Sequence, residues 1–140
     1  MKQQLILKLH AEQCSCVVFN HATTRLFHER GVKDLHKLLR TEAEWLRGAM
    51  IADTVVGKGA AALMVAGGVG WVYAEVISQA ALELFHEHGI EVKAGRTVPN
   101  IINRKGDDIC PVEKLCLRCH TIDECLEKID EFLLSIARSA

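Results

Sequence analysis

An alanine-rich stretch near the middle of the chain, residues 51–68, constrains the fold most. It reads IADTVVGKGAAALMVAGG, so Asp53 and the group Gly57, Lys58 and Gly59 precede a run of small apolar residues. Alanines favour a helix, and Asp53 can accept hydrogen bonds from the free N–H groups of a first turn. A lysine and two glycines near a helix start leave room and charge for an anionic ligand. We therefore predict a binding site at the start of a buried helix.

The composition is that of one globular domain, which we expect to span residues 1–140. A chain of 140 residues can bury a core without disulfides. The net charge of −1 gives no reason to expect a nucleic acid or an anionic membrane surface as partner. Glycines at 67, 68 and 70 interrupt the apolar stretch 60–77, so no membrane-spanning helix is expected. Six cysteines without a secretory signal indicate reduced thiols and a cytoplasmic location, and the oligomeric state stays open.

The hydrophobic pattern predicts an α/β domain in which helices and strands alternate. The expected helices are 2–13, 34–47, the alanine-rich helix to Gly68, 79–88, a short helix opening at Cys110 and Pro111, and a last helix from Thr121 to Ala137. The expected strands are 14–20 and 23–28, which form a hairpin ended by Gly31, then 70–76, 90–93 and 97–102. Ser78 and Thr121 are expected to be N-caps.

The order hairpin, helix, strand, helix, strand and C-terminal helical segment is that of the cytidine-deaminase-like fold. The chain also resembles a family of short proteins of unassigned function that have this fold. The matching segments are DTVVGKGAAA from Asp53, YAEVISQAA from Tyr73, NR at 103–104, and CPVE from Cys110. The resemblance spans most of the chain and implies a three-layer α-β-α sandwich with a mixed sheet. It implies no particular reaction.

The motifs of zinc-dependent deaminases are missing from the positions where that fold would need them. Such enzymes carry H-x-E at one helix start and P-C-x-x-C at the next. The matching helix starts here, 53–58 and 75–78, contain neither histidine nor cysteine. The sequence HAE at 10–12 precedes the hairpin, and CLRC at 116–119 lies in the last quarter of the chain. We therefore predict no zinc-dependent deamination and no cofactor.

Four cysteines near the C-terminus could form a different kind of metal site. They are Cys110, Cys116, Cys119 and Cys125. Four thiolates can hold zinc or an iron–sulfur cluster, but only one Cys-x-x-Cys pair is present. Cys125 also falls in the apolar stripe of the last helix, where a buried cysteine packs as a small hydrophobe. Core packing is the preferred interpretation, and metal binding stays the alternative.

Cys110 is the candidate nucleophile of the chain. If Cys110 caps the helix that Pro111 begins, its sulfur lies at the positive end of that helix, which favours the thiolate. Glu113 then occupies the third helical position, where its carboxylate can return to the cap N–H or face a pocket. A plain helix cap explains the same tetrapeptide equally well.

Two functions follow from these residues and stay open. The first is an enzyme, or a former enzyme, with a polar pocket for a small metabolite of nucleotide-like type. The second is a non-catalytic binding or regulatory domain. The proposed catalytic residues are Cys110, Glu113 and Lys58, and the proposed ligand-binding residues are Asp53, Gly57, Gly59, Glu75, Ser78 and Asn103. Lys58 and Glu75 are expected to form an ion pair if the two helix starts lie side by side.

Overall fold

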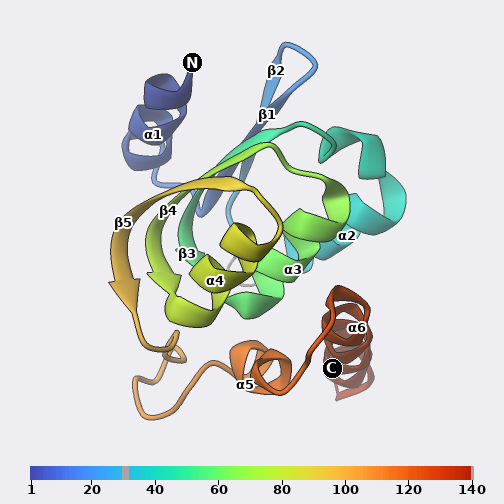
Figure 1. Ribbon diagram of the computed structural model, residues 1–140. Helices are drawn as coiled ribbons and strands as arrows, with labels where there is room; N and C mark the ends of the chain where they lie inside the picture. The colour runs from blue at the N-terminus through green and yellow to red at the C-terminus, as the bar shows by residue number, and fades with distance from the viewer. Residues whose placement is uncertain (30–31, 140) are drawn as a thin grey trace.

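Five strands form one mixed sheet in the computed structural model, which describes residues 1–29 and 32–139 (Figure 1). The strands are β1 (Cys16–Asn20), β2 (Thr23–Phe27), β3 (Met50–Val56), β4 (Trp71–Ser78) and β5 (Glu91–Val98). Their order across the sheet is β2-β1-β3-β4-β5. β1 is antiparallel to β2 and β3, whereas β3, β4 and β5 are parallel to one another. Parallel neighbours need crossover connections, which are provided by helices α3 (Lys58–Gly67) and α4 (Gln79–Glu87).

Helices cover both faces of the sheet, which confirms the predicted three-layer α-β-α sandwich (Figure 1). On one face, α1 (Lys2–Ala11) packs Leu5 and Leu9 against Trp71 and Tyr73 of β4. On the other face, α2 (Lys33–Thr41), α3 and α4 enclose the larger core. Most residues of α3 are apolar and buried, which allows that helix to lie at the centre of this layer.

The C-terminal helices α5 (Pro111–Leu117) and α6 (Ile122–Ser139) pack on α3 beyond the end of the parallel strands (Figure 1). The carboxylate of Asp130 on α6 contacts His36 at 2.7 Å and Arg40 at 2.5 Å, so it ties α6 to α2. Among the described residues no helix is long and apolar enough to cross a membrane, α6 included.

The prediction that Asp53 begins the alanine-rich helix is wrong. Asp53 lies inside β3, where its register neighbours are Cys16 on β1 and Ala74 on β4. β3 is a central strand that is buried on both faces, so its sequence lacks the alternation of apolar and polar residues that marks a half-exposed strand. The helix begins only at Lys58 and ends at Gly68, whose φ of +76° is a left-handed conformation that suits glycine.

Other boundaries also differ from the predictions. The helix predicted at 34–47 divides into α2 and a short 3-10 helix, Ala43–Trp45. The strand β5 joins the strands predicted at 90–93 and 97–102, but it ends at Val98, so residues 99–102 lie beyond it. The expected N-caps are confirmed, because the hydroxyls of Ser78 and Thr121 accept the N–H groups of Ala81 and Glu124 at 3.3 and 3.1 Å. The expected end of the hairpin at Gly31 lies outside the described residues.

Candidate functional site

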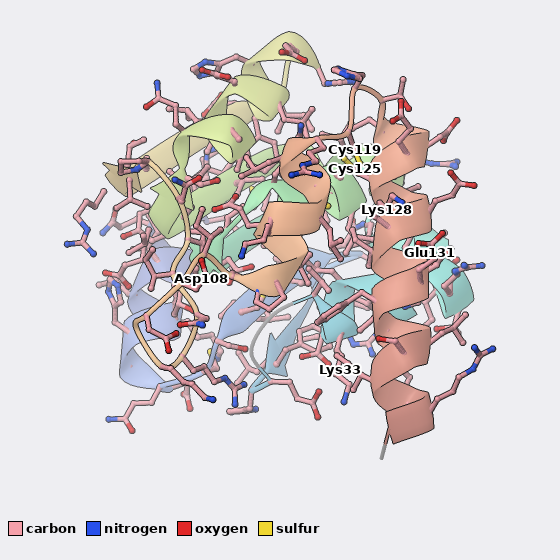
Figure 2. The ribbon with its side chains drawn as sticks, turned by 90° about the horizontal axis from the view of Figure 1, so that it is seen from below. Lys33, Asp108, Cys119, Cys125, Lys128 and Glu131 are labelled. Atoms are coloured by element: carbon pink, nitrogen blue, oxygen red, sulfur yellow. The ribbon has the colours of Figure 1, made fainter. Side chains whose placement is uncertain are left out.

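A groove of about 740 Å³ opens beside the C-terminal end of β3, between α5, α6 and the loop 99–110. We call it the C-terminal groove. Figure 2 views this side of the molecule, with the loop that carries Asp108, α5, α6 and Lys33 around it. In open α/β sheets ligands bind outside the C-terminal ends of parallel strands, so the groove lies where that rule places a site. Its lining residues are Val32, Lys33, Val55, Gly57, Ala60, Ile101–Lys105, Asp107, Cys110–Glu113, Phe132, Leu133 and Ile136.

Glu113 occupies the inner wall of the groove and joins three segments. Its Oε1 accepts the backbone N–H of Lys58 at 2.9 Å and the hydroxyl of Ser78 at 2.7 Å. Its Oε2 accepts the backbone N–H of Ile101. Only 1% of this residue is exposed. The carboxylate therefore lies at the N-termini of α3 and α4, in the position where an anionic ligand would bind a helix start.

Gly57 and Gly59 allow α5 to approach α3 closely. A Cβ on Gly57 would lie 3.2 Å from Oε1 of Glu113, and a Cβ on Gly59 would lie 2.4 Å from Cγ1 of Val112. The second distance is a steric overlap. Gly57 still lines the groove, whereas Gly59 is buried beneath Val112. Their main role in this geometry is to admit α5, and the space predicted for a ligand at Gly59 is filled by protein.

The predicted ion pair of Lys58 and Glu75 is not formed. The Nζ of Lys58 donates to the carbonyl oxygen of Cys119 at 2.9 Å, beneath the end of α5. Glu75 belongs to the other face of the sheet, where its carboxylate contacts the imidazole of His10 at 2.9 Å. Successive side chains of a strand point to opposite faces, so Glu75 cannot share the environment of its neighbour Ala74 on the α3 side.

Two further predicted ligand residues have structural partners. Ser78 is fully buried behind Glu113, where it donates to that carboxylate and caps α4. Asn103 lines the groove, and its side-chain oxygen accepts the N–H groups of Gly106 and Asp107 at 2.9 and 3.3 Å. Asn103 therefore shapes the loop that forms one wall of the groove.

Asp53 lies in a separate cavity of about 30 Å³, which Cys16, Glu29 and Asp34 also line. Asp53 is 8% exposed. Its Oδ1 accepts the backbone N–H of Val55 at a long 3.4 Å. Burial raises the pKa of the Asp53 carboxyl from 3.8 to about 7. Asp53 therefore does not line the C-terminal groove with the other predicted ligand residues, but a separate small cavity.

The four C-terminal cysteines do not gather at one point. Cys110 is half-buried in the groove wall, whereas Cys116, Cys119 and Cys125 meet behind α5. No three histidine, cysteine, aspartate or glutamate side chains converge as a metal site within residues 1–29 and 32–139. The helix starts at Gly57 and Ser78 offer no thiol or imidazole, so these residues do not fit the zinc of a deaminase.

The sequence interpretation missed the basic and apolar walls of the groove. Lys33, Arg104 and Lys105 bring positive charge to it, and Phe132, Leu133 and Ile136 of α6 supply an apolar side. The adjacent basic pair at 104–105 was a usable signal, because it directly follows Asn103. The contribution of α6 had no such signal, since an apolar stripe on a helix predicts burial as readily as a pocket wall.

Comparison with known proteins identifies the family but no activity. The family model TM1506, described as a domain of unknown function (DUF1893), matches residues 4–133. A crystal structure of a DUF1893 family protein from Thermotoga maritima is similar over 92% of this chain and 87% of that chain, with a TM-score of 0.84 and 23% identity. No curated protein matches the chain.

A second solved structure is similar only in part. It is a diaminohydroxyphosphoribosylaminopyrimidine deaminase/5-amino-6-(5-phosphoribosylamino)uracil reductase from Thermotoga maritima. The similarity covers 58% of this chain and 29% of that chain, with a TM-score of 0.42 and 22% identity, too low to carry an argument. The family match covers nearly the whole chain, and the protein therefore belongs to the DUF1893 family.

Proposed function

We propose that the C-terminal groove binds a small molecule with a flat apolar body and an anionic group, as a nucleotide-like metabolite has. The observation that carries this proposal is the pairing of an apolar wall with a basic rim in one groove of about 740 Å³. Ligand pockets of 300–1,000 Å³ typically combine apolar walls with a few placed polar groups. The nucleotide-like class rests in addition on an analogy with the cytidine-deaminase-like fold.

The charges of the groove favour an anion. Lys33, Arg104 and Lys105 are exposed at its rim. Arg104 and Lys105 have no ion pair among the described residues, whereas the negative Asp107 is bound by the amide of Asn103 at 2.9 Å. An arginine can hold a phosphate through two parallel hydrogen bonds, which gives it direction as well as charge.

The contacts of the three proposed catalytic residues support binding more than catalysis. Glu113 accepts three hydrogen bonds from the protein, and the Lys58 ammonium is directed to the carbonyl of Cys119. Neither group is placed to exchange a proton with a ligand in the groove. Of the three, Cys110 is a free, half-buried cysteine that lines the groove. We therefore propose a binding domain, and the Cys110→Ser variant is expected to keep its affinity for the ligand.

Thermal unfolding with defined probes tests the proposal. The four nucleoside monophosphates, their parent nucleosides and inorganic phosphate are each titrated into the protein at fixed salt. At least one monophosphate is expected to raise the melting temperature with concentration, because a ligand that binds only the folded state stabilises it. Its nucleoside should bind more weakly, since it lacks the charge that the basic rim attracts.

A pair of double variants separates the groove from general electrostatics. Arg104→Ala with Lys105→Ala is expected to weaken binding about tenfold or more, equivalent to roughly 1.4 kcal/mol. Lys8→Ala with Lys93→Ala removes the same charge from α1 and β5, away from the groove, and should leave the affinity unchanged. Equal affinities for both double variants, or no stabilisation by any of the probes, would overturn the proposal.

A further inference from the structure

Three cysteine thiols meet where α3, α5 and α6 join, away from the groove wall that Cys110 lines. Cys116 is on α5, Cys119 follows the end of that helix, and Cys125 is in the second turn of α6. The thiols of Cys116 and Cys119 both lie near enough to that of Cys125 to influence its pKa, and the Cys119 thiol donates to the carbonyl oxygen of Leu115 at 3.6 Å. Figure 2 shows Cys119 and Cys125 side by side, between the end of α5 and the start of α6. We call these residues the thiol cluster.

The thiol cluster is buried, and one member lies closest to solvent. Cys116 is 0% exposed, Cys125 is 1% exposed and Cys119 is 6% exposed. Cys119 is thus the member nearest to solvent, and a reagent as small as hydrogen peroxide is expected to reach the cluster past it.

The ammonium group of Lys58 lies near the thiol cluster. The Nζ of Lys58 donates to the carbonyl oxygen of Cys119 at 2.9 Å, which holds the ammonium group close to the three sulfurs. Hydrogen bonding from Cys116, together with the charge of Lys58, lowers the pKa of the Cys125 thiol to about 7. The same hydrogen bond raises the pKa of Cys116, and burial raises that of Cys119. The two neighbouring thiols and the lysine thus offset the loss of hydration of the Cys125 thiol.

We propose that the thiol cluster is an oxidation site at which a peroxide converts Cys125 and Cys119 into a disulfide. The Cys125 thiolate attacks one oxygen of hydrogen peroxide, the O–O bond breaks, and the products are a sulfenic acid and hydroxide, which takes up a proton to become water. The sulfur of Cys119 then attacks the sulfenic sulfur, the S–O bond breaks, and the Cys119 proton leaves with the hydroxyl group as a second water. Peroxide is reduced, and the two cysteines are oxidised by two electrons in total.

Cys119 is a better partner than Cys116 because it lies outside the helices. Cys116 lies inside α5 and its sulfur packs against α3, 3.6 Å from where a Cβ of Gly59 would stand. Cys119 comes after the last turn of α5, in the connection to α6. A disulfide needs a specific separation of the two Cα atoms, and a connecting loop can adjust to it more readily than a packed helix.

The disulfide would link the two helices that form the C-terminal groove. α5 contributes Val112 and Glu113 to its wall, and α6 contributes Phe132 and Leu133. Oxidation is therefore expected to restrain the groove at the end where α5 and α6 meet. This restraint would act on the groove whether or not a ligand binds there.

Treatment of the native protein with one to two equivalents of hydrogen peroxide at neutral pH, followed by peptide mass spectrometry, tests the proposal. A disulfide between Cys119 and Cys125 is expected as the main product, and it should be reversed by a dithiol. Its absence from wild type, with both cysteines still reduced, overturns the proposal. A main product that joins Cys116 to Cys119 or to Cys125 overturns the assigned pairing.

Variants distinguish the roles within the cluster. Cys125→Ala is expected to abolish the disulfide, whereas Cys116→Ser should still form it. Lys58→Met keeps the length of the side chain but removes the charge, so the oxidation rate at pH 7 should fall about tenfold, since less thiolate is present. Cys14 and Cys16 serve as an internal control, because both are buried, burial raises the pKa of each thiol, and both should stay reduced. An unchanged rate in Lys58→Met overturns the role given to the lysine.

Discussion

Two buried carboxyl groups of this protein lie in opposite kinds of surroundings. Glu113 is 1% exposed and accepts three hydrogen bonds at the starts of α3 and α4. Asp53 is 8% exposed and lies inside β3, where it accepts the N–H of Val55 at 3.4 Å and where Asp34 and Glu29 line the same cavity. Glu113 joins three segments through the hydrogen bonds that it accepts. Burial instead raises the pKa of Asp53, which favours its neutral form.

The comparison shows that burial alone does not set the role of an ionisable group. A buried carboxylate at helix N-termini can accept several N–H and O–H groups and thereby hold separate segments together. A carboxyl whose hydrogen bonds do not replace its lost hydration is favoured in the neutral form, as burial does to Asp53. Glu113 was predicted to be catalytic and Asp53 to bind a ligand, yet in each case the protein itself supplies hydrogen-bond partners.

Removal of the better supported carboxylate should have the larger effect. Glu113→Ala leaves the N–H groups of Lys58 and Ile101 and the hydroxyl of Ser78 without their acceptor. We expect the free energy of unfolding to fall by roughly 3–5 kcal/mol, because unsatisfied buried donors and a cavity both add to the loss. Equilibrium denaturation by urea measures this change.

Glu113→Gln is the matched control for that variant. It keeps one oxygen acceptor and the volume of the side chain but lacks the charge, so it should lose distinctly less stability than Glu113→Ala. If both variants unfold within about 0.5 kcal/mol of wild type, the difference expected for a surface substitution, Glu113 is not the bridge described here.

The second prediction concerns Asp53 and pH. Its pKa in the folded protein, about 7, is above its ordinary value of 3.8 because of burial. The folded state therefore binds this proton more tightly than the unfolded state does. The stabilisation is fully present below about pH 4 and is lost as the pH rises through 7, by an amount on the order of 4 kcal/mol.

Asp53→Asn isolates this contribution from those of other titrating groups. The difference in unfolding free energy between wild type and Asp53→Asn should change with pH between 4 and 8, in favour of the variant at the higher pH. Urea denaturation at several pH values measures it. A constant difference across that range would mean that Asp53 keeps its ordinary pKa.

Much of the fold could be predicted because its signals are local. The alanine run predicts α3, Ser78 and Thr121 predict two helix starts, and Gly68 ends a helix where its left-handed φ requires a glycine. β3 was missed because a strand buried on both faces has no alternating pattern, and Asp53 at its centre resembles a helix cap.

The site was less predictable because its contacts are distant in sequence. Glu113 bonds to Lys58 and Ser78, which lie 55 and 35 residues away. The tetrapeptide CPVE at 110–113 indicates a helix start correctly. No residue near it in the sequence shows which groups the Glu113 carboxylate binds. The glycines at 57 and 59 suggested room for a ligand, and α5 fills part of that room because Val112 packs onto Gly59. Local patterns identify such a place in the chain, and only the packing of distant segments decides what occupies it.

The smallest expected effect tests whether Glu113 and Ser78 act together. Ser78→Ala removes the donor to Oε1 of Glu113 and the acceptor of the Ala81 N–H at the start of α4. We expect a loss of about 1–2 kcal/mol in the wild-type protein, the range for an N-cap and one buried hydrogen bond. In the Glu113→Ala background the same substitution should cost less, because the serine hydroxyl has already lost its acceptor. A double-mutant cycle by urea denaturation gives the coupling energy. Thr121→Ala, which removes an exposed cap on α6, is the control and should cost the same in both backgrounds. Equal costs of Ser78→Ala in the two backgrounds would show that the serine caps α4 independently of Glu113.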